Sequence, residues 1–314
     1  MRLNTSLIAA ASLAVVAGAA NSRAAITVNG SLDAGYGSPI VVQQNATGFG
    51  DSNSGTVGFA NGSELDAGYG VIDGGNLCIF LSGNLESNFN KCDIFIDCKA
   101  GGSQKLIGLG NNQGNFNNMG GDGVTTGLTF DNGMAPDHWI SPTIGGATPD
   151  MFVDYGDLQA HTGNYSGQTL AASNGVLTGG NGGPPILLTL NNSNITGVTG
   201  TTAPNDAATV GTGIELCISL ADLGWDGSDI HVAAFINNGD HNYLSNQVLG
   251  GLAGGTGNLG GDGAGNFTGN AYGVDFRQFA GDQFFTISVP EPGALSLLGG
   301  AALVLARRGR RSSK

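Results

Sequence analysis

Glycine is the residue that most constrains this chain, because it occupies 57 of the 314 positions, against an average usage of about 7 %. Each interior glycine costs a helix about 1 kcal/mol, so long helices are disfavoured. No Gly-X-Y period runs through the chain, which excludes a collagen triple helix. Hydrophobic residues make up 40 % of the chain, too many for a disordered polypeptide. The composition therefore predicts an all-β protein with many loops.

Short apolar runs separated by glycine, asparagine and aspartate predict the strands. Residues 77–81 are apolar at every position, as in a central strand covered on both faces. We expect one helical turn at 220–224 and long surface loops at 171–183 and 250–265. No charged or proline-rich linker interrupts 25–289, so we predict one jelly-roll-like, Gly-rich β-sandwich domain. The predicted strands are 26–28, 39–43, 76–82, 92–98, 126–130, 151–155, 186–190, 214–220, 229–236 and 284–289.

Charge is distributed unevenly along the chain. Seven of the 11 basic residues lie near its two ends, and residues 25–289 keep four basic and 23 acidic side chains, a net charge of −19. Such a domain repels nucleic acid, whose binding needs lysine and arginine to neutralise phosphates. It also repels anionic membrane surfaces. It could collect divalent cations.

The N-terminal residues 1–24 have the three parts of a secretory signal peptide. Arg2 is the positive charge, Leu7 to Ala20 form the apolar run, and Ser22 to Ala24 supply small residues for cleavage. The alternative, a membrane anchor, is weaker because 14 helical residues span only about 21 Å. We therefore expect export, with the Sec translocon and signal peptidase as partners.

The C-terminal residues 290–314 contain Pro290-Glu291-Pro292, an apolar run at 293–306 expected to form a short helix, and an arginine-rich tail. This order resembles the PEP-CTERM sorting signal of Gram-negative bacteria. The resemblance implies an intermediate anchored in the inner membrane, removal of the segment by the membrane peptidase exosortase, and release to the cell surface or exterior. A plain transmembrane anchor is the alternative. The sorting residues are Pro290, Glu291, Pro292, Arg307, Arg308, Arg310 and Arg311.

Three segments of the domain are similar to family 9 carbohydrate-binding modules and related DOMON-like sandwiches. They are ITVNGSLDAGYG (26–37), CDIFIDCKAGG (92–102) and GIELCISLADLG (213–224). The resemblance implies a sandwich that binds sugars. The tryptophans lie outside these segments, so the sugar platform of the modules is not carried over. The candidates for stacking against a sugar, which could equally be core residues, are Trp139, Trp225, Tyr155 and Tyr243.

The four cysteines leave several pairings open. Cys92 and Cys98 lie on one predicted strand about 20 Å apart, too far for a disulfide, whose Cα atoms are within about 7 Å. A bridge from Cys78 or Cys92 to Cys217 is possible in an exported protein. Without a Cys-x-x-Cys motif, a zinc site is not expected.

The sequence contains no catalytic motif of the common hydrolases. No His-Glu-x-x-His motif and no Gly-x-Ser-x-Gly elbow occurs. Asp93 and Asp97 lie about 13 Å apart along one strand, beyond the separation of at most about 9.5 Å that glycosidase carboxylates use. We interpret both as solvated residues near strand ends.

Calcium is the cofactor that best fits the acidic loops, since it prefers carboxylates and backbone carbonyls. The candidate ligands are Asp122, Asp222, Asp226, Asp229 and Asp262. Two short sequences recur: LDAGYG at 32–37 and 65–70, and Asn-x-Gly-Gly-Asp-Gly at 118–123 and 258–263. We interpret these repeats as shared turn structures. They are also where an ion or a partner is first expected.

Together these patterns predict a non-enzymatic exported protein of the cell surface or extracellular matrix, associated with extracellular polysaccharide. The first alternative is a carbohydrate-binding module. The second is an extracellular hydrolase that uses acidic residues.

Overall fold

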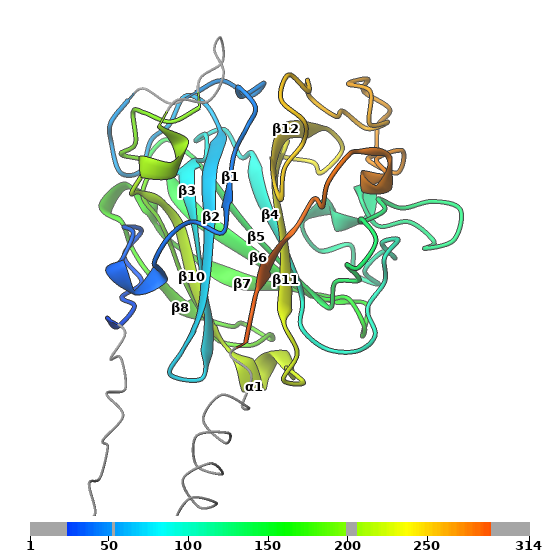
Figure 1. Cartoon of the computed structure of the whole chain (residues 1–314), viewed down its shortest axis with the longest axis horizontal. Coiled ribbons are helices and arrows are strands. Elements are labelled where there is room, and N and C mark those ends of the chain that lie inside the picture. The colour runs from blue at the N-terminus through cyan, green and yellow to red at the C-terminus, as the bar shows by residue number, and fades with distance from the viewer. Residues whose placement is uncertain (1–23, 52–53, 199–205, 290–314) are drawn as a thin grey trace, which may run out of the picture.

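Two antiparallel β-sheets packed face to face form the molecule (Figure 1). The computed structural model describes residues 24–51, 54–198 and 206–289. The predicted signal peptide and sorting segment, apart from Ala24, lie outside these residues. The all-β class predicted from glycine content is confirmed.

The first sheet has six strands in the order β1-β2-β3-β10-β9-β8. The chain therefore enters it twice, once through β1 to β3 and again, about a hundred residues later, through β8 to β10. The strands are β1 (Val41–Val42), β2 (Glu64–Asp73), β3 (Asn76–Asn84), β8 (Leu177–Gly179), β9 (Ile186–Leu190) and β10 (Gly213–Ser219).

The second sheet has the order β12-β11-β4-β5-β6-β7, and β13 also pairs with β11. Its strands are β4 (Lys91–Asp97), β5 (His138–Gly145), β6 (Asp150–Asp157), β7 (Thr162–Leu170), β11 (Ile230–Asn237), β12 (Leu244–Leu249) and β13 (Phe285–Ile287). Helical structure in the described residues is limited to α1 (Leu220–Leu223) and the 3-10 turns η1 (Ala34–Tyr36), η2 (Gln113–Asn118), η3 (Ala171–Ser173), η4 (Ala207–Thr209) and η5 (Phe276–Gln278). No helix in the described part of the chain is long and apolar enough to span a bilayer.

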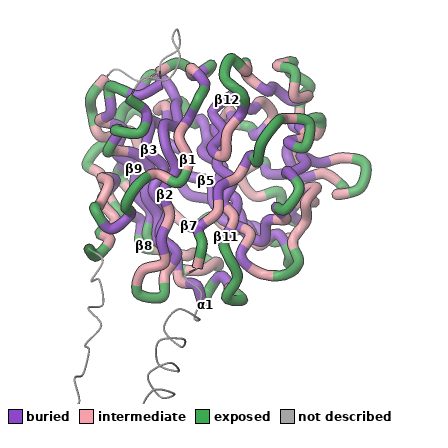
Figure 2. The backbone as a smooth tube through the Cα atoms, in the orientation of Figure 1, coloured by how far each residue is buried: buried purple, intermediate pink, exposed green. Residues whose placement is uncertain are grey.

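Alternating side chains of both sheets fill the space between them. The face shared by Ile214, Leu216 and Ile218 meets the face shared by Ile94 and Ile96 in one large buried cluster. Cys92 and Cys98 belong to the same cluster, as their position on the strand face predicted. Figure 2 shows the buried strands at the centre and the exposed turns around them.

Both outer faces of the sandwich are also covered. Phe80 and Tyr69 on the first sheet pack under the N-terminal segment, against Tyr36. On the second sheet, segments 99–137 and 250–283 form a cover over Phe95 and Phe235. The prediction that 77–81 is covered on both faces is therefore confirmed.

Several local predictions differ from the structure. The apolar run at 126–130 forms only isolated bridges, because Leu128 and Phe130 turn inward as part of the cover. The loop 250–265 is not purely a surface loop, since Leu252 and Leu259 are buried in the same cluster. The strands β2, β5, β7, β8 and β12 were not predicted.

The two LDAGYG copies do not share a turn. The first forms the 3-10 turn η1, whereas the second lies inside strand β2. Their tyrosines nevertheless pack edge to face, with the Tyr36 and Tyr69 ring centroids 6.4 Å apart. The interpretation of this repeat as a common turn was wrong.

A disulfide links neighbouring strands of the first sheet. Cys78 on β3 is the direct register partner of Cys217 on β10, with Cα atoms 4.1 Å apart. Cys92 and Cys98 are free and buried. The structure thus selects Cys78 from the two partners that the sequence left open for Cys217.

Candidate functional site

A row of buried polar side chains crosses the outer face of the second sheet beneath the cover. Asp93 of β4, Ser141 of β5 and Asp154 of β6 occupy successive strands on this face. His241, from the turn between β11 and β12, inserts over them. Asp93, Ser141 and His241 are completely buried. This is the densest polar network that joins the sheet to its cover.

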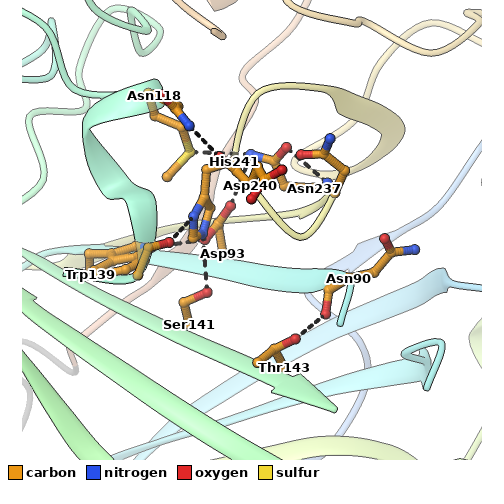
Figure 3. A network of polar contacts seen from close by, with 12 residues as sticks. Asn90, Asp93, Asn118, Trp139, Ser141, Thr143, Asn237, Asp240 and His241 are labelled. Atoms are coloured by element: carbon orange, nitrogen blue, oxygen red, sulfur yellow. Dashed lines mark hydrogen bonds and ion pairs between the residues drawn. The ribbon is translucent and has the colours of Figure 1, made fainter. Parts of the chain in front are cut away.

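Asp93 is the centre of this network (Figure 3). Its Oδ1 accepts hydrogen bonds from His241 Nε2 at 2.8 Å and from Trp139 Nε1 at 2.9 Å. Its Oδ2 accepts one from Asn237 Nδ2 at 3.2 Å. Every partner approaches with a donor, so the geometry suits an ionised carboxylate.

The His241 ring is held between two acceptors. Nδ1 faces the carbonyl oxygen of Gly114 at 2.8 Å, and Nε2 faces Asp93. A carbonyl and an ionised carboxylate both act as acceptors, so the geometry suits a ring that donates from both nitrogens, as an imidazolium does. Burial alone would raise the pKa of Asp93, but the charge and hydrogen bond of His241, together with the hydrogen bonds of Trp139 and Ser141, lower it overall.

Ser141, His241 and Asp93 include the residue types of a hydrolytic triad, but their geometry differs from it. In a triad the aspartate and the serine contact opposite ring nitrogens. Here Ser141 Oγ lies 3.5 Å from Nε2, the nitrogen that Asp93 also contacts. All three side chains are completely buried. The arrangement holds a charge pair in place rather than activating a nucleophile.

The same network fastens the cover to the sheet. Next to His241, Asp240 accepts hydrogen bonds from Asn115 and Asn118 of the cover. The interpretation of Asp93 as a solvated residue was wrong. The cover packs on the outer face of β4 and buries Asp93 completely. Asp97, at the end of the same strand, is partly exposed.

The two Gly-Gly-Asp-Gly turns use their aspartates as caps. Asp122 Oδ1 accepts the backbone N–H groups of residues 124, 125 and 126. Asp262 Oδ1 accepts those of residues 264 and 266. Side-chain hydrogen bonds from Thr125 to Asp122 and from Asn266 to Asp262, together with these backbone hydrogen bonds, lower the pKa of both carboxyls. For this repeat the shared turn is confirmed.

The remaining calcium candidates do not converge. Asp226 accepts backbone N–H groups of Ala100 and Ser228, and Asp229 accepts that of Val289. Asp222 is exposed in the turn of α1. In residues 24–51, 54–198 and 206–289, no three histidine, cysteine or acidic side chains gather in a way that could hold a metal ion.

Two of the four sugar-stacking candidates are core residues. Trp139 is completely buried and Tyr155 is 4 % exposed, because one lies under the cover and the other between the sheets. Neither can offer a ring face to a sugar, so these two predictions were wrong. Trp225 and Tyr243 are partly exposed. Tyr243 already stacks on Phe49, with centroids 6.1 Å apart.

Aromatic rings that the sequence analysis missed lie on the open end of this outer face. Phe89 is 46 % exposed and Tyr165 is 36 % exposed. The Phe89 and Phe152 ring centroids are 6.2 Å apart, and strand register places Phe152 opposite Gln168. Phe89 has φ of 71°, unusual for a bulky residue. The Phe89 ring lies against Gly145, where a Cβ would meet it. No local sequence pattern indicates this contact.

In comparisons with known proteins, no family model, no curated protein and no solved structure matches this chain. The sorting residues 290–292 and 307–311 lie outside the described residues.

Proposed function

We propose that this chain is a non-enzymatic exported protein that exosortase releases to the cell surface or extracellular matrix, where it associates with polysaccharide. The observation that carries the proposal is the order of Pro290-Glu291-Pro292, the apolar run 293–306 and the arginine-rich tail, behind an N-terminal signal-like segment. The Arg-rich tail suits retention of the last residues in the cytoplasm.

The disulfide supports export. Disulfides persist in oxidising compartments outside the cytoplasm and are rare within it. Cys78 and Cys217 are direct partners in the ladder of two central strands. A chain that passes through an oxidising compartment would form this bridge as β3 and β10 pair.

The two ends of the described chain lie at the same pole of the molecule (Figure 1). Ile26 donates its backbone N–H to Asp73 at the β2–β3 turn, and Val289 donates its own to Asp229. Leu220 of α1 joins this pole through a hydrogen bond to Gly75. This placement would let the domain fold outside the membrane while its C-terminal segment is still inserted.

Fractionation of cells that express the full chain tests the proposal. We expect the wild-type protein outside the inner membrane with its C-terminal peptide removed, as measured by mass spectrometry. A variant in which residues 290–292 are all alanine should remain in the inner membrane at full length. A wild-type protein retained in the cytoplasm would contradict export. A surface protein that keeps the peptide would contradict release but not export.

Carbohydrate binding is the second candidate, and the exposed rings of Phe89 and Tyr165 favour it. An aromatic ring beside an amide such as Gln168 is a common way to bind a sugar face and its hydroxyls. Affinity electrophoresis in gels containing the host polysaccharide should show retardation that Phe89→Ala and Tyr165→Ala reduce. Phe59→Ala, another exposed phenylalanine, is the control. Equal mobility with and without polysaccharide would contradict this candidate.

A further inference from the structure

A second group of buried acids lies at the start of β2, in the first sheet. Glu64 is 1 % exposed and Asp66 is completely buried. The β2–β3 register shifts between Leu65 and Ala67, which leaves Asp66 outside the regular ladder. Two carboxyl groups are thus buried two residues apart, although burying an unpaired charge is costly.

Four oxygen atoms converge on one nitrogen beside these acids. Asn194 Nδ2 lies 2.9 Å from Glu64 Oε1, 3.1 Å from Asn84 Oδ1 and 3.5 Å from Asp66 Oδ2. It also contacts the carbonyl oxygen of Thr196. A carboxamide nitrogen carries only two protons. It therefore cannot satisfy all four oxygens.

An unpartnered oxygen provides a second, independent observation. Glu64 Oε2 is buried and has no hydrogen-bond partner among the described residues. The other oxygen of the same carboxyl group, Oε1, is one of the four oxygens that converge on Asn194 Nδ2. Buried polar atoms in native proteins nearly always have a partner. The oxygen without a partner therefore belongs to the same side chain as one of the four acceptor oxygens that outnumber the two amide protons of Asn194.

The donor set has the chemistry of a hard divalent cation. Two carboxylates, one side-chain amide oxygen and one backbone carbonyl are the ligands that calcium takes, usually six to eight oxygens with water completing the shell. With both Glu64 oxygens engaged, this chain supplies five. Calcium tolerates such irregular geometry, whereas magnesium demands a near-ideal octahedron.

We propose that Glu64, Asp66, Asn84 and the carbonyl of Thr196 bind a calcium ion, with the Asn194 carboxamide moved aside. The ion offsets two buried negative charges and engages the unpartnered Glu64 oxygen. Asp66 belongs to the second LDAGYG copy, one of the places where an ion was expected, but none of the loop aspartates first considered takes part. The site is independent of the proposed export.

Burial favours the uncharged form of both acids when no cation is bound. Burial, together with the charge of Asp66, raises the pKa of Glu64 to about 9. Burial raises the pKa of Asp66 to about 8. Calcium binding at neutral pH would therefore release protons.

Calcium titration of the purified full chain, after removal of metal with a chelator, tests the proposal by calorimetry and thermal unfolding. We expect one bound calcium per chain, and at free calcium 100 times Kd the folding constant should rise about 100-fold. Glu64→Gln and Asp66→Asn should abolish this rise. The matched controls Asp122→Asn and Asp262→Asn, at an exposed and a partly exposed turn aspartate among the first candidates, should retain it.

Asn194→Asp separates the calcium site from a merely structural cluster. With calcium the third carboxylate should tighten binding, and in chelator it should lower the unfolding temperature. In chelator Glu64→Gln should unfold no earlier than the wild type, which shows that the variant folds. The proposal is overturned if millimolar calcium produces neither binding heat nor a shift in unfolding temperature. It is also overturned if Glu64→Gln binds calcium as the wild type does.

Discussion

The buried carboxylates of this protein are stabilised in two different ways. Asp93 is ionised because His241, Trp139 and Asn237 all present donors to it. Glu64 and Asp66 both contact the Asn194 amide, Asp66 also accepts the backbone N–H of Val198, and Glu64 Oε2 has no hydrogen-bond partner among the described residues. Buried carboxyl groups therefore have an ion-pair partner under the cover and only amide and backbone partners at the start of β2. We therefore expect opposite effects on stability when Asp93 and Glu64 are replaced by their amides.

Replacement of one member of the Asp93–His241 pair should strongly destabilise the fold. In Asp93→Asn the imidazolium remains buried without its counter-charge, which typically costs about 3–5 kcal/mol. Urea unfolding followed by tryptophan fluorescence measures the loss. Asp282→Asn, at an exposed aspartate of the cover, should change the free energy of unfolding by less than about 0.5 kcal/mol. Equal effects of the two variants would contradict the ion pair.

The pH dependence of stability should reveal Glu64 in the absence of calcium. Its ordinary pKa is 4.5 and burial raises its pKa to about 9. Below pH 4.5 the group is protonated in both states. As pH rises towards 9 the unfolded state loses this proton first, so the free energy of unfolding falls.

The difference between wild type and Glu64→Gln isolates this contribution, because the glutamine side chain of the variant does not titrate. Thermal unfolding in chelator between about pH 5 and pH 9 should show the wild type losing stability relative to the variant. Saturating calcium should reverse the trend, since the cation binds the ionised form. A pH-independent difference in chelator would contradict the raised pKa.

At the scale of elements, several strands with clear apolar periodicity were predicted, whereas the glycine-containing strand β2 was not. β3, β9, β10 and β11 follow the predicted ranges within a residue or two, and so does the turn at α1. β2 contains the LDAGYG sequence, whose glycines indicate a turn. In the folded protein Gly70 instead makes room for Ile287 of β13, because a Cβ there would lie 2.2 Å from Ile287 Cδ1.

The disulfide between β3 and β10 should contribute a large share of stability. It closes 139 residues of chain, and removing such a native bridge typically costs about 2–5 kcal/mol. A Cys78→Ala, Cys217→Ala double variant should lose this amount in urea unfolding. Adding reductant should destabilise the wild type but leave the double variant unchanged.

Thiol titration provides the control for that prediction. Burial raises the pKa of Cys92 far above its usual range and that of Cys98 to about 12, so the folded protein should react slowly with thiol reagents. Unfolding without reductant should expose only the two free cysteines, Cys92 and Cys98. Four reactive thiols under those conditions would contradict the bridge.

At the scale of the whole molecule, a strongly acidic surface surrounds a sandwich whose two outer faces are both covered. The net charge of −19 within 25–289 favours self-repulsion, which salt screens. The cover of the second sheet carries few positive charges to offset this net charge. One of them, Arg277, pairs with Asp275. The molecule should therefore respond both to ionic strength and to specific cations.

Raising sodium chloride from about 10 mM to about 500 mM should increase the unfolding temperature, because the Debye length shortens from about 30 Å to below 10 Å. This response should be gradual and should persist in Glu64→Gln. The response to calcium should saturate and be lost in that variant. Differential scanning calorimetry of both proteins distinguishes the two effects. An unfolding temperature that falls with sodium chloride would contradict the self-repulsion argument.

The sequence by itself determined the class of fold and the apolar strands β3, β9, β10 and β11, and it supplied the expectation of export. These properties follow from local patterns: glycine spacing, two-residue alternation of apolar side chains, and the ordered parts of the two end segments. Only the tertiary structure decided which polar residues are buried together. Asp93 meets His241 across 148 positions, and Glu64 meets Asn194 across 130. Such encounters depend on how two sheets and their cover pack, and no short stretch of sequence carries that information.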